Sequence, residues 1–188
     1  NLQWPLREEA IVHSAQGEAE LRGTRPYDFV VRAQVDGPNI PSFDGVANGT
    51  LDNESISIAE YELLGLNGRA TGTGTLEFDQ PRRWTLTAEA RDLDVGEVFA
   101  DFPGRVGFRA NASGEGLDTK ATFDLAVAEL RGMLRDQPLR GSGHVARAKD
   151  RWDLRSVHVA LGSARLDLDA KLANTIDAKW NFSTRSLD

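Results

Sequence analysis

Apolar and polar residues alternate with a period of two along most of the chain, which is the pattern of a β-strand with one apolar face. In WTLTAEA (84–90), Trp84 and Leu86 fall on one side, with threonine and glutamate on the other. The same alternation recurs in FVVRAQV (29–35), ESISIAEY (54–61), RVGFRANA (105–112), TFDLAVAEL (122–130), ARLDLDAKL (164–172) and TIDAKWNFS (175–183). The pattern predicts an all-β fold.

Turn-forming residues separate these segments. Glycine, proline, asparagine and aspartate gather between the alternating runs, where they favour tight turns and interrupt strands. The predicted turns lie at 36–41, 51–55, 79–83, 115–119, 135–138, 148–151 and 172–175. Strands and turns that follow one another this closely predict an antiparallel meander.

One segment departs from the alternation. In DLDVGEVFADFPG (92–104), Val95, Val98, Phe99 and Phe102 recur at helical spacing. An aspartate precedes them as a candidate N-cap, and Pro-Gly follows as a stop signal. We therefore expect one short helix near 94–102, at an end of the sheet.

The alternation leaves three architectures open. A closed barrel, a sandwich of two sheets and a long curved sheet would each hide an apolar strand face from water. The period of two does not choose among them, because all three use strands with one apolar face.

A hairpin unit repeats along the chain. TGTGTLEFDQPRRWTL (71–86) matches RGSGHVARAKDRWDL (140–154), and looser copies are SGEGLDTKATFDL (113–125) and QGEAELRGTRPYDFVV (16–31). Each copy is a glycine-bearing strand, a turn and a strand led by an aromatic residue, a unit that needs stacked neighbours to bury its apolar side. Because glycine in a strand permits bending and close approach, we expect the sheet to bend at Gly72, Gly74, Gly141 and Gly143.

No motif predicts catalysis, a cofactor or a metal site. The glycines of GRATGTGTLEF (68–78) are followed by another alternating stretch, whereas a phosphate-binding loop needs a helix there and a Lys-Ser/Thr pair. His13, His144 and His158 lie far apart, without the spacing of metal ligands. Asp167 and Asp169 alternate with leucine, which is typical of a solvated strand face rather than of paired catalytic acids.

Composition narrows the function classes further. The net charge of -7 argues against nucleic acid, because that affinity comes mostly from neutralised phosphates. The chain has no cysteine, which excludes disulfides and fits an oxidising compartment such as the periplasm. No apolar run approaches the roughly 20 residues that span a bilayer, and the chain starts without methionine. We expect a piece of a longer protein whose anchor lies elsewhere.

The segment RDLDVGEVFADFPGRVGFRANASGEG (91–116) resembles a motif of the TamB family, within the wider AsmA-like group. Together with the hairpin copies, the resemblance covers most of 10–175, although the first 60 residues repeat less clearly and the last aromatic strand lacks a preceding G-x-G. The motif positions are occupied by Asp92, Leu93, Asp94, Pro103, Gly104, Arg105 and Gly114.

The resemblance implies a fold and a role. Such proteins are anchored in the Gram-negative inner membrane and cross the periplasm as a long curved antiparallel sheet, folded into a taco-like open groove with an apolar interior. They are implicated in moving phospholipid to the outer membrane, and the TamB branch also in assembling or secreting outer-membrane barrel proteins with the barrel partner TamA. Residues 1–188 would be a single β-repeat segment of that groove.

A lipid conduit needs a continuous apolar lining and no catalytic residue or cofactor. The lining residues that we predict, all from the apolar sides of the strands, are Val31, Ile58, Trp84, Leu86, Phe108, Phe123, Leu125, Leu154, Leu166, Leu168, Trp180 and Phe182. A scaffold for nascent outer-membrane strands is the second hypothesis. A structural β-repeat module with a sealed core is the third.

Overall fold

The computed structural model describes residues 2–4, 12–14, 16–37, 40–118 and 120–184. Nearly all of them belong to β-strands. The strands are β1 (Leu2–Trp4), β2 (Val12–Ser14), β3 (Gly17–Arg22), β4 (Tyr27–Gly37), β5 (Ile40–Leu51), β6 (Ser55–Gly65), β7 (Gly68–Glu77), β8 (Arg83–Asp94), β9 (Gly104–Glu115), β10 (Thr122–Leu134), β11 (Gln137–Ala148), β12 (Arg151–Leu161), β13 (Ala164–Leu172) and β14 (Ile176–Ser183).

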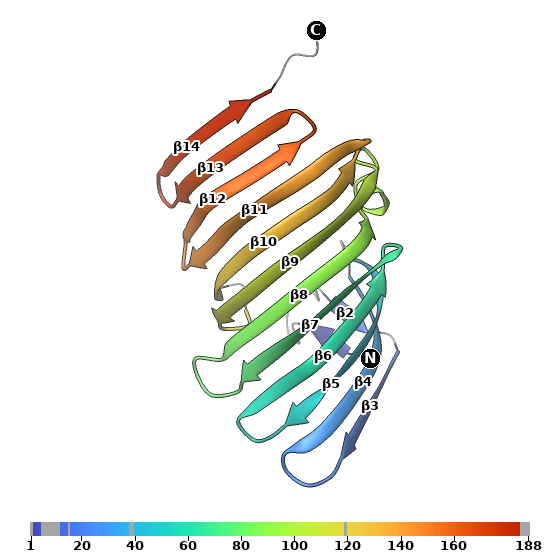
Figure 1. Cartoon of the computed structure of the whole chain (residues 1–188). Helices are drawn as coiled ribbons and strands as arrows, with labels where there is room; N and C mark the ends of the chain where they lie inside the picture. The colour runs from blue at the N-terminus through green and yellow to red at the C-terminus, as the bar shows by residue number, and fades with distance from the viewer. Residues whose placement is uncertain (1, 5–11, 15, 38–39, 119, 185–188) are drawn as a thin grey trace.

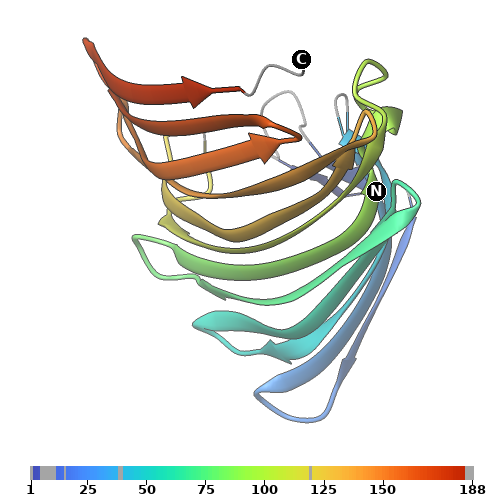
Figure 2. The same ribbon diagram turned by 45° about the horizontal axis from the view of Figure 1, so that its top comes forward.

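The strands form a single antiparallel sheet in sequence order. From β4 to β14 each strand pairs with the next one along the chain, and β3 and β2 both pair with β4. The strands lie side by side from β3 at one end to β14 at the other (Figure 1), and the second view shows that they bow (Figure 2). The outermost strands do not meet in the described part of the chain. The sheet is therefore curved and open, which confirms the taco-like groove and excludes the closed barrel and the sandwich.

The register sorts the side chains onto two faces, because residues paired across a ladder point to the same side. One row starts at Leu86 on β8, pairs with Ala112 and then Leu125, and continues through Val145 and Leu154. The side that carries such rows is called the apolar face, and the residues on it are called inward. The other side carries the intervening threonines and charged residues and is called the polar face.

Little of this sheet is sealed from water. The buried apolar residues are few and mostly small, and no large side chain in the described ranges is fully buried. No second sheet or helix packs extensively over either face among the described elements. A protein of this length ordinarily closes a core between two layers. The apolar face here has no second layer from the described residues.

Several connections are two-residue turns with left-handed backbone. Leu66 and Asn67 have φ of 51° and 54°, and Arg135 and Asp136 have 49° and 61°. Two successive residues with positive φ fit the right-handed twist of a hairpin. The predicted turns fall between the observed strands, although 38–39 and 119 lie outside the described residues. The turns at 66–67 and 162–163 were not predicted.

The expected helix is much shorter than 94–102. Only a 3-10 turn forms, η1 (Val95–Glu97), with the Asp94 side chain accepting a hydrogen bond from Gly96 N, as the N-cap prediction required. Phe99 and Phe102 are 63% and 48% exposed, so a longer helix would gain no buried face to offset its cost. The glycine inside the first turn weakens it further.

Candidate apolar binding face

All the predicted lining residues lie on the apolar face. The register joins them in continuous rows across the strands: Ile58 pairs with Gly74, Phe123 with Gly114, and Leu168 with Trp180. Most are half-buried, whereas Leu86, Trp180 and Phe182 are 39%, 70% and 55% exposed. The face offers a broad apolar surface whose side chains are more exposed on β14 than on the middle strands.

Large side chains on this face lie over glycines of the neighbouring strands. A methyl group added at Gly114 would lie 2.6 Å from Cζ2 of Trp84, and one added at Gly65 would collide with the ring of Phe43. The Trp84 indole also donates from Nε1 to the Gly116 carbonyl, 3.0 Å away. Large side chains of the apolar face therefore occupy the space that these glycines leave empty.

The predicted bending glycines coincide with breaks in register. Gly72 and Gly74 lie opposite the shift between Ile58 and Tyr61 on β6. Gly143 lies opposite the extra residues of both neighbouring strands, β10 and β12, and Gly141 lies on the same face of β11. A β-bulge bends the strand that contains it and increases the local twist. The extra residues lie on β6, β10 and β12, opposite the glycines, so bending at the glycines themselves stays a prediction.

One ionisable side chain of the apolar face, Tyr61, is partly buried. Tyr61 points inward from β6 and its hydroxyl donates to the Thr87 carbonyl at 2.8 Å. Burial raises the pKa of the Tyr61 phenol above its usual value, because the charged form loses its hydration.

A cluster at one rim was not predicted. Arg147, the last inward residue of β11, pairs in register with Phe123 on one side and Trp152 on the other. Its guanidinium lies 5.5 Å from the Trp152 ring centre, and the two aromatic rings meet edge to face at 5.5 Å. The alternation Gly143, Val145, Arg147 already placed the arginine on this side in the sequence.

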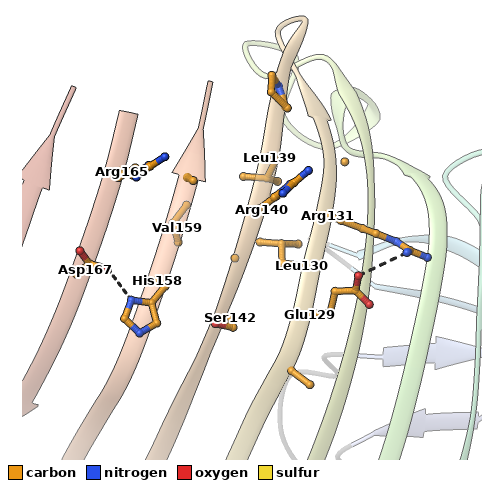
Figure 3. A pocket seen from close by; sticks show the side chains of 15 residues that line it. Glu129, Leu130, Arg131, Leu139, Arg140, Ser142, His158, Val159, Arg165 and Asp167 are labelled. Atoms are coloured by element: carbon orange, nitrogen blue, oxygen red, sulfur yellow. Dashed lines mark hydrogen bonds and ion pairs between the residues drawn. The ribbon is translucent and has the colours of Figure 1, made fainter. Parts of the chain in front are cut away.

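The polar face carries a shallow hollow of about 760 Å³ across β10 to β13. Figure 3 shows its polar side chains: Glu129 bonds Arg131 at 3.4 Å, and His158 bonds Asp167 at 2.6 Å. Arg140 and Arg165 also line it, and so do Leu130, Leu139 and Val159. The ionisable groups are largely exposed, so the Glu129–Arg131 ion pair and the His158–Asp167 hydrogen bond contribute little to stability.

The strand register brings three residues that are far apart in sequence next to one another on β11, β12 and β13: Ser142, His158 and Asp167. His158 bonds Asp167 through Nδ1, but no hydrogen bond joins Ser142 to His158 among the described residues. The arrangement lacks the nucleophile–base contact that acyl transfer needs.

Other ionisable groups pair locally. His144 Nε2 lies 2.6 Å from Asp124 Oδ1 on the polar face, where Arg155 also approaches the carboxylate. No group of three or more acidic or histidine side chains in the described ranges could hold a metal ion. None of the described helices has the length and apolarity needed to traverse a membrane.

The comparisons agree with this geometry. The family model described as TamB, N-terminal domain matches residues 1–188. No curated protein and no solved structure is significantly similar to the chain. The match spans the whole open sheet and its apolar face, and the chain therefore belongs to the TamB family.

Proposed function

We propose that the apolar face holds phospholipid acyl chains and shields them from water on their way between the inner and outer membranes. Membership of the TamB family supports a role in the cell envelope, in outer-membrane assembly or lipid transport. In this proposal the chain is one segment of a longer periplasmic protein anchored in the inner membrane.

The observation that carries the proposal is an apolar face that no described layer covers. The inward rows run without interruption from β4 to β14, yet no large side chain of the described residues is fully buried. A sealed structural module would bury such side chains. The uncovered face therefore favours a conduit over the third hypothesis.

The energetics fit an acyl ligand. Each methylene exposed to water costs about 0.8 kcal/mol, so an acyl chain of about 16 carbons would face roughly 13 kcal/mol in open solvent. A surface of leucine, valine, alanine and aromatic side chains removes much of that cost without specific polar contacts. Loose recognition suits transport, because the lipid must also leave.

Strand addition at the sheet edge is the second candidate. β14 ends the described sheet, and Ile176 is 75% and Trp180 70% exposed on it. An open edge can pair with an extended segment of another chain, such as a nascent strand of an outer-membrane barrel protein. In that role the protein would work with a TamA-like barrel partner.

Native mass spectrometry of the chain purified from Gram-negative cells distinguishes the two candidates. The conduit predicts co-purified phospholipid, released as adducts of phospholipid mass. Loss of these adducts in a Leu86→Asp variant, and their retention in Thr87→Asp on the polar face, would locate them. Adducts of protein mass with no lipid would contradict the conduit and favour the scaffold.

A further inference from the structure

Arg147 is the only charged side chain at an inward register position in strands β3 to β14 of the described residues. Every other inward position in these ladders holds an apolar or uncharged residue. A cation on an apolar surface loses hydration and costs free energy unless something compensates it. Its presence there calls for a partner.

The structure gives this cation only part of a partner. Its guanidinium lies over the Trp152 ring, which compensates some of the charge. Its Nε is buried and meets no hydrogen-bond acceptor among the described residues. No carboxylate of the described ranges forms an ion pair with it. An outside anion cannot reach the enclosed Nε, but no hydrogen bond or ion pair of the described residues engages the terminal Nη groups, which are therefore left for an anion from outside the chain.

The surroundings identify the kind of anion. Arg147 lies at the rim where the even-numbered strands begin, and four of these strands start with an inward aromatic residue: Tyr27, Trp84, Phe123 and Trp152. Tryptophan and tyrosine favour boundaries where one side is apolar and the other wet. An anion here would have apolar neighbours on one side and water on the other.

We propose that Arg147 binds the phosphodiester of a phospholipid and that the aromatic rim marks the boundary between headgroup and acyl chains. This inference rests on the proposed function and adds an orientation to it. The headgroup stays at the rim beside the β11–β12 turn, and the acyl chains cross the apolar face. Guanidinium groups bind phosphate oxygens through charge-assisted hydrogen bonds, and Arg147 has donors available for such bonds.

The test is calorimetric titration of the 188-residue chain with three compounds. Dihexanoyl-phosphatidylglycerol carries both chemistries, dihexanoylglycerol has the same acyl chains without phosphate, and sodium phosphate has no acyl chains. Arg147→Met keeps an apolar stem on the apolar face, so the fold should survive. Arg140→Met, on the polar face, is the matched control, and circular dichroism checks both variants.

Arg147→Met should weaken dihexanoyl-phosphatidylglycerol binding about tenfold, which corresponds to about 1.4 kcal/mol, and leave dihexanoylglycerol binding unchanged. Arg147→Lys should recover part of the loss, and Arg140→Met should change neither. If Arg147→Met weakens the binding of both acyl compounds equally, or of neither, the Arg147 site is wrong and the proposed function is not affected. Phosphate binding as tight as the lipid's would assign the site to free phosphate. Failure of the unchanged chain to bind either acyl compound would instead contradict the proposed function, and the site with it.

Discussion

The two faces of the sheet are held together by different means. On the polar face, short bonds join neighbouring strands: Thr75 and Thr85 hydroxyls lie 2.7 Å apart, and Arg83 pairs with Glu77 at 2.7 Å. On the apolar face, large side chains such as Trp84 lie over glycines. Exposed polar pairs tolerate change, whereas packed surfaces respond to each added or removed atom. Substitutions on the two faces should therefore differ in cost.

The largest contrast should come from one added charge. Ala90 is 2% exposed on the apolar face, so Ala90→Asp would bury a carboxylate without a partner and should cost about 4 kcal/mol or prevent folding. Ala160→Asp makes the same change on the polar face, opposite Arg140 and Arg165. It should change stability by less than about 0.5 kcal/mol. Urea unfolding measures both, and equal costs would contradict the division into two faces.

Tryptophan truncation should separate the packed middle of the apolar face from its exposed end. Trp84→Ala loses the contacts over Gly114 and the bond to the Gly116 carbonyl, and should cost about 3 kcal/mol. Trp180→Ala removes a ring that is already 70% exposed and should cost less than about 1 kcal/mol. The free energies of unfolding in urea give the comparison. A larger loss for Trp180 would mean that β14 is covered in solution.

Substitution by alanine should cost different amounts of stability at two glycines of β7 that lie only two residues apart. A methyl group at Gly72 would collide with the Thr87 carbonyl oxygen and lie 2.8 Å from Cε1 of Tyr61, so Gly72→Ala should cost about 2 kcal/mol. At Gly74 the nearest atom is the Thr85 carbonyl oxygen at 3.2 Å, so Gly74→Ala should cost less than about 1 kcal/mol. Thermal unfolding ranks the pair. The reverse order would refute the packing described for β7.

The smallest effect should be that of Asp52 in the β5–β6 turn. Hydrogen bonds from the backbone N–H groups of Glu54 and Ser55 hold the pKa of this carboxyl below its usual range. A lowered pKa adds stability above the unfolded-state value of about 3.9, and the gain disappears as pH falls through the folded-state value. Asp52→Asn should be slightly less stable at pH 7, and the difference should vanish in acid. Thermal melts across pH measure it; a difference that grows on acidification would contradict the assignment.

Strand identity and the faces followed directly from the alternation. The alternation in WTLTAEA predicts that Trp84 and Leu86 lie on the same side of the strand. The register of β8 with β9 confirms that both lie on the apolar face. The hairpin repeats became β7–β8 and β11–β12. This succeeded because a period of two needs only local information. The same information could not choose between barrel, sandwich and open sheet, which depends on whether distant edges meet.

The failures have local and non-local causes. The usual hairpin signal, Asn-Gly, occurs at 67–68 in the sequence. The turn itself is formed one residue earlier, by Leu66 and Asn67, and leucine rarely has a positive φ. The helix was predicted from the spacing of its apolar residues alone. Spacing does not show whether those residues become buried, and Val98, Phe99 and Phe102 stay exposed. The pairing of His158 with Asp167 depends on strand register. The inward position of Arg147 could have been predicted from the alternation alone, because Arg147 follows Val145 by two residues.

Lipid should occupy the apolar face of the sheet and not the polar face. Photo-crosslinking in living Gram-negative cells tests it most directly, with a photoreactive residue at Leu166 or at its neighbour Asp167 on β13, which point to opposite faces. A conduit on the apolar face should give phospholipid adducts at 166 and few or none at 167. Protein adducts alone at 166, or equal lipid adducts at both positions, would contradict it.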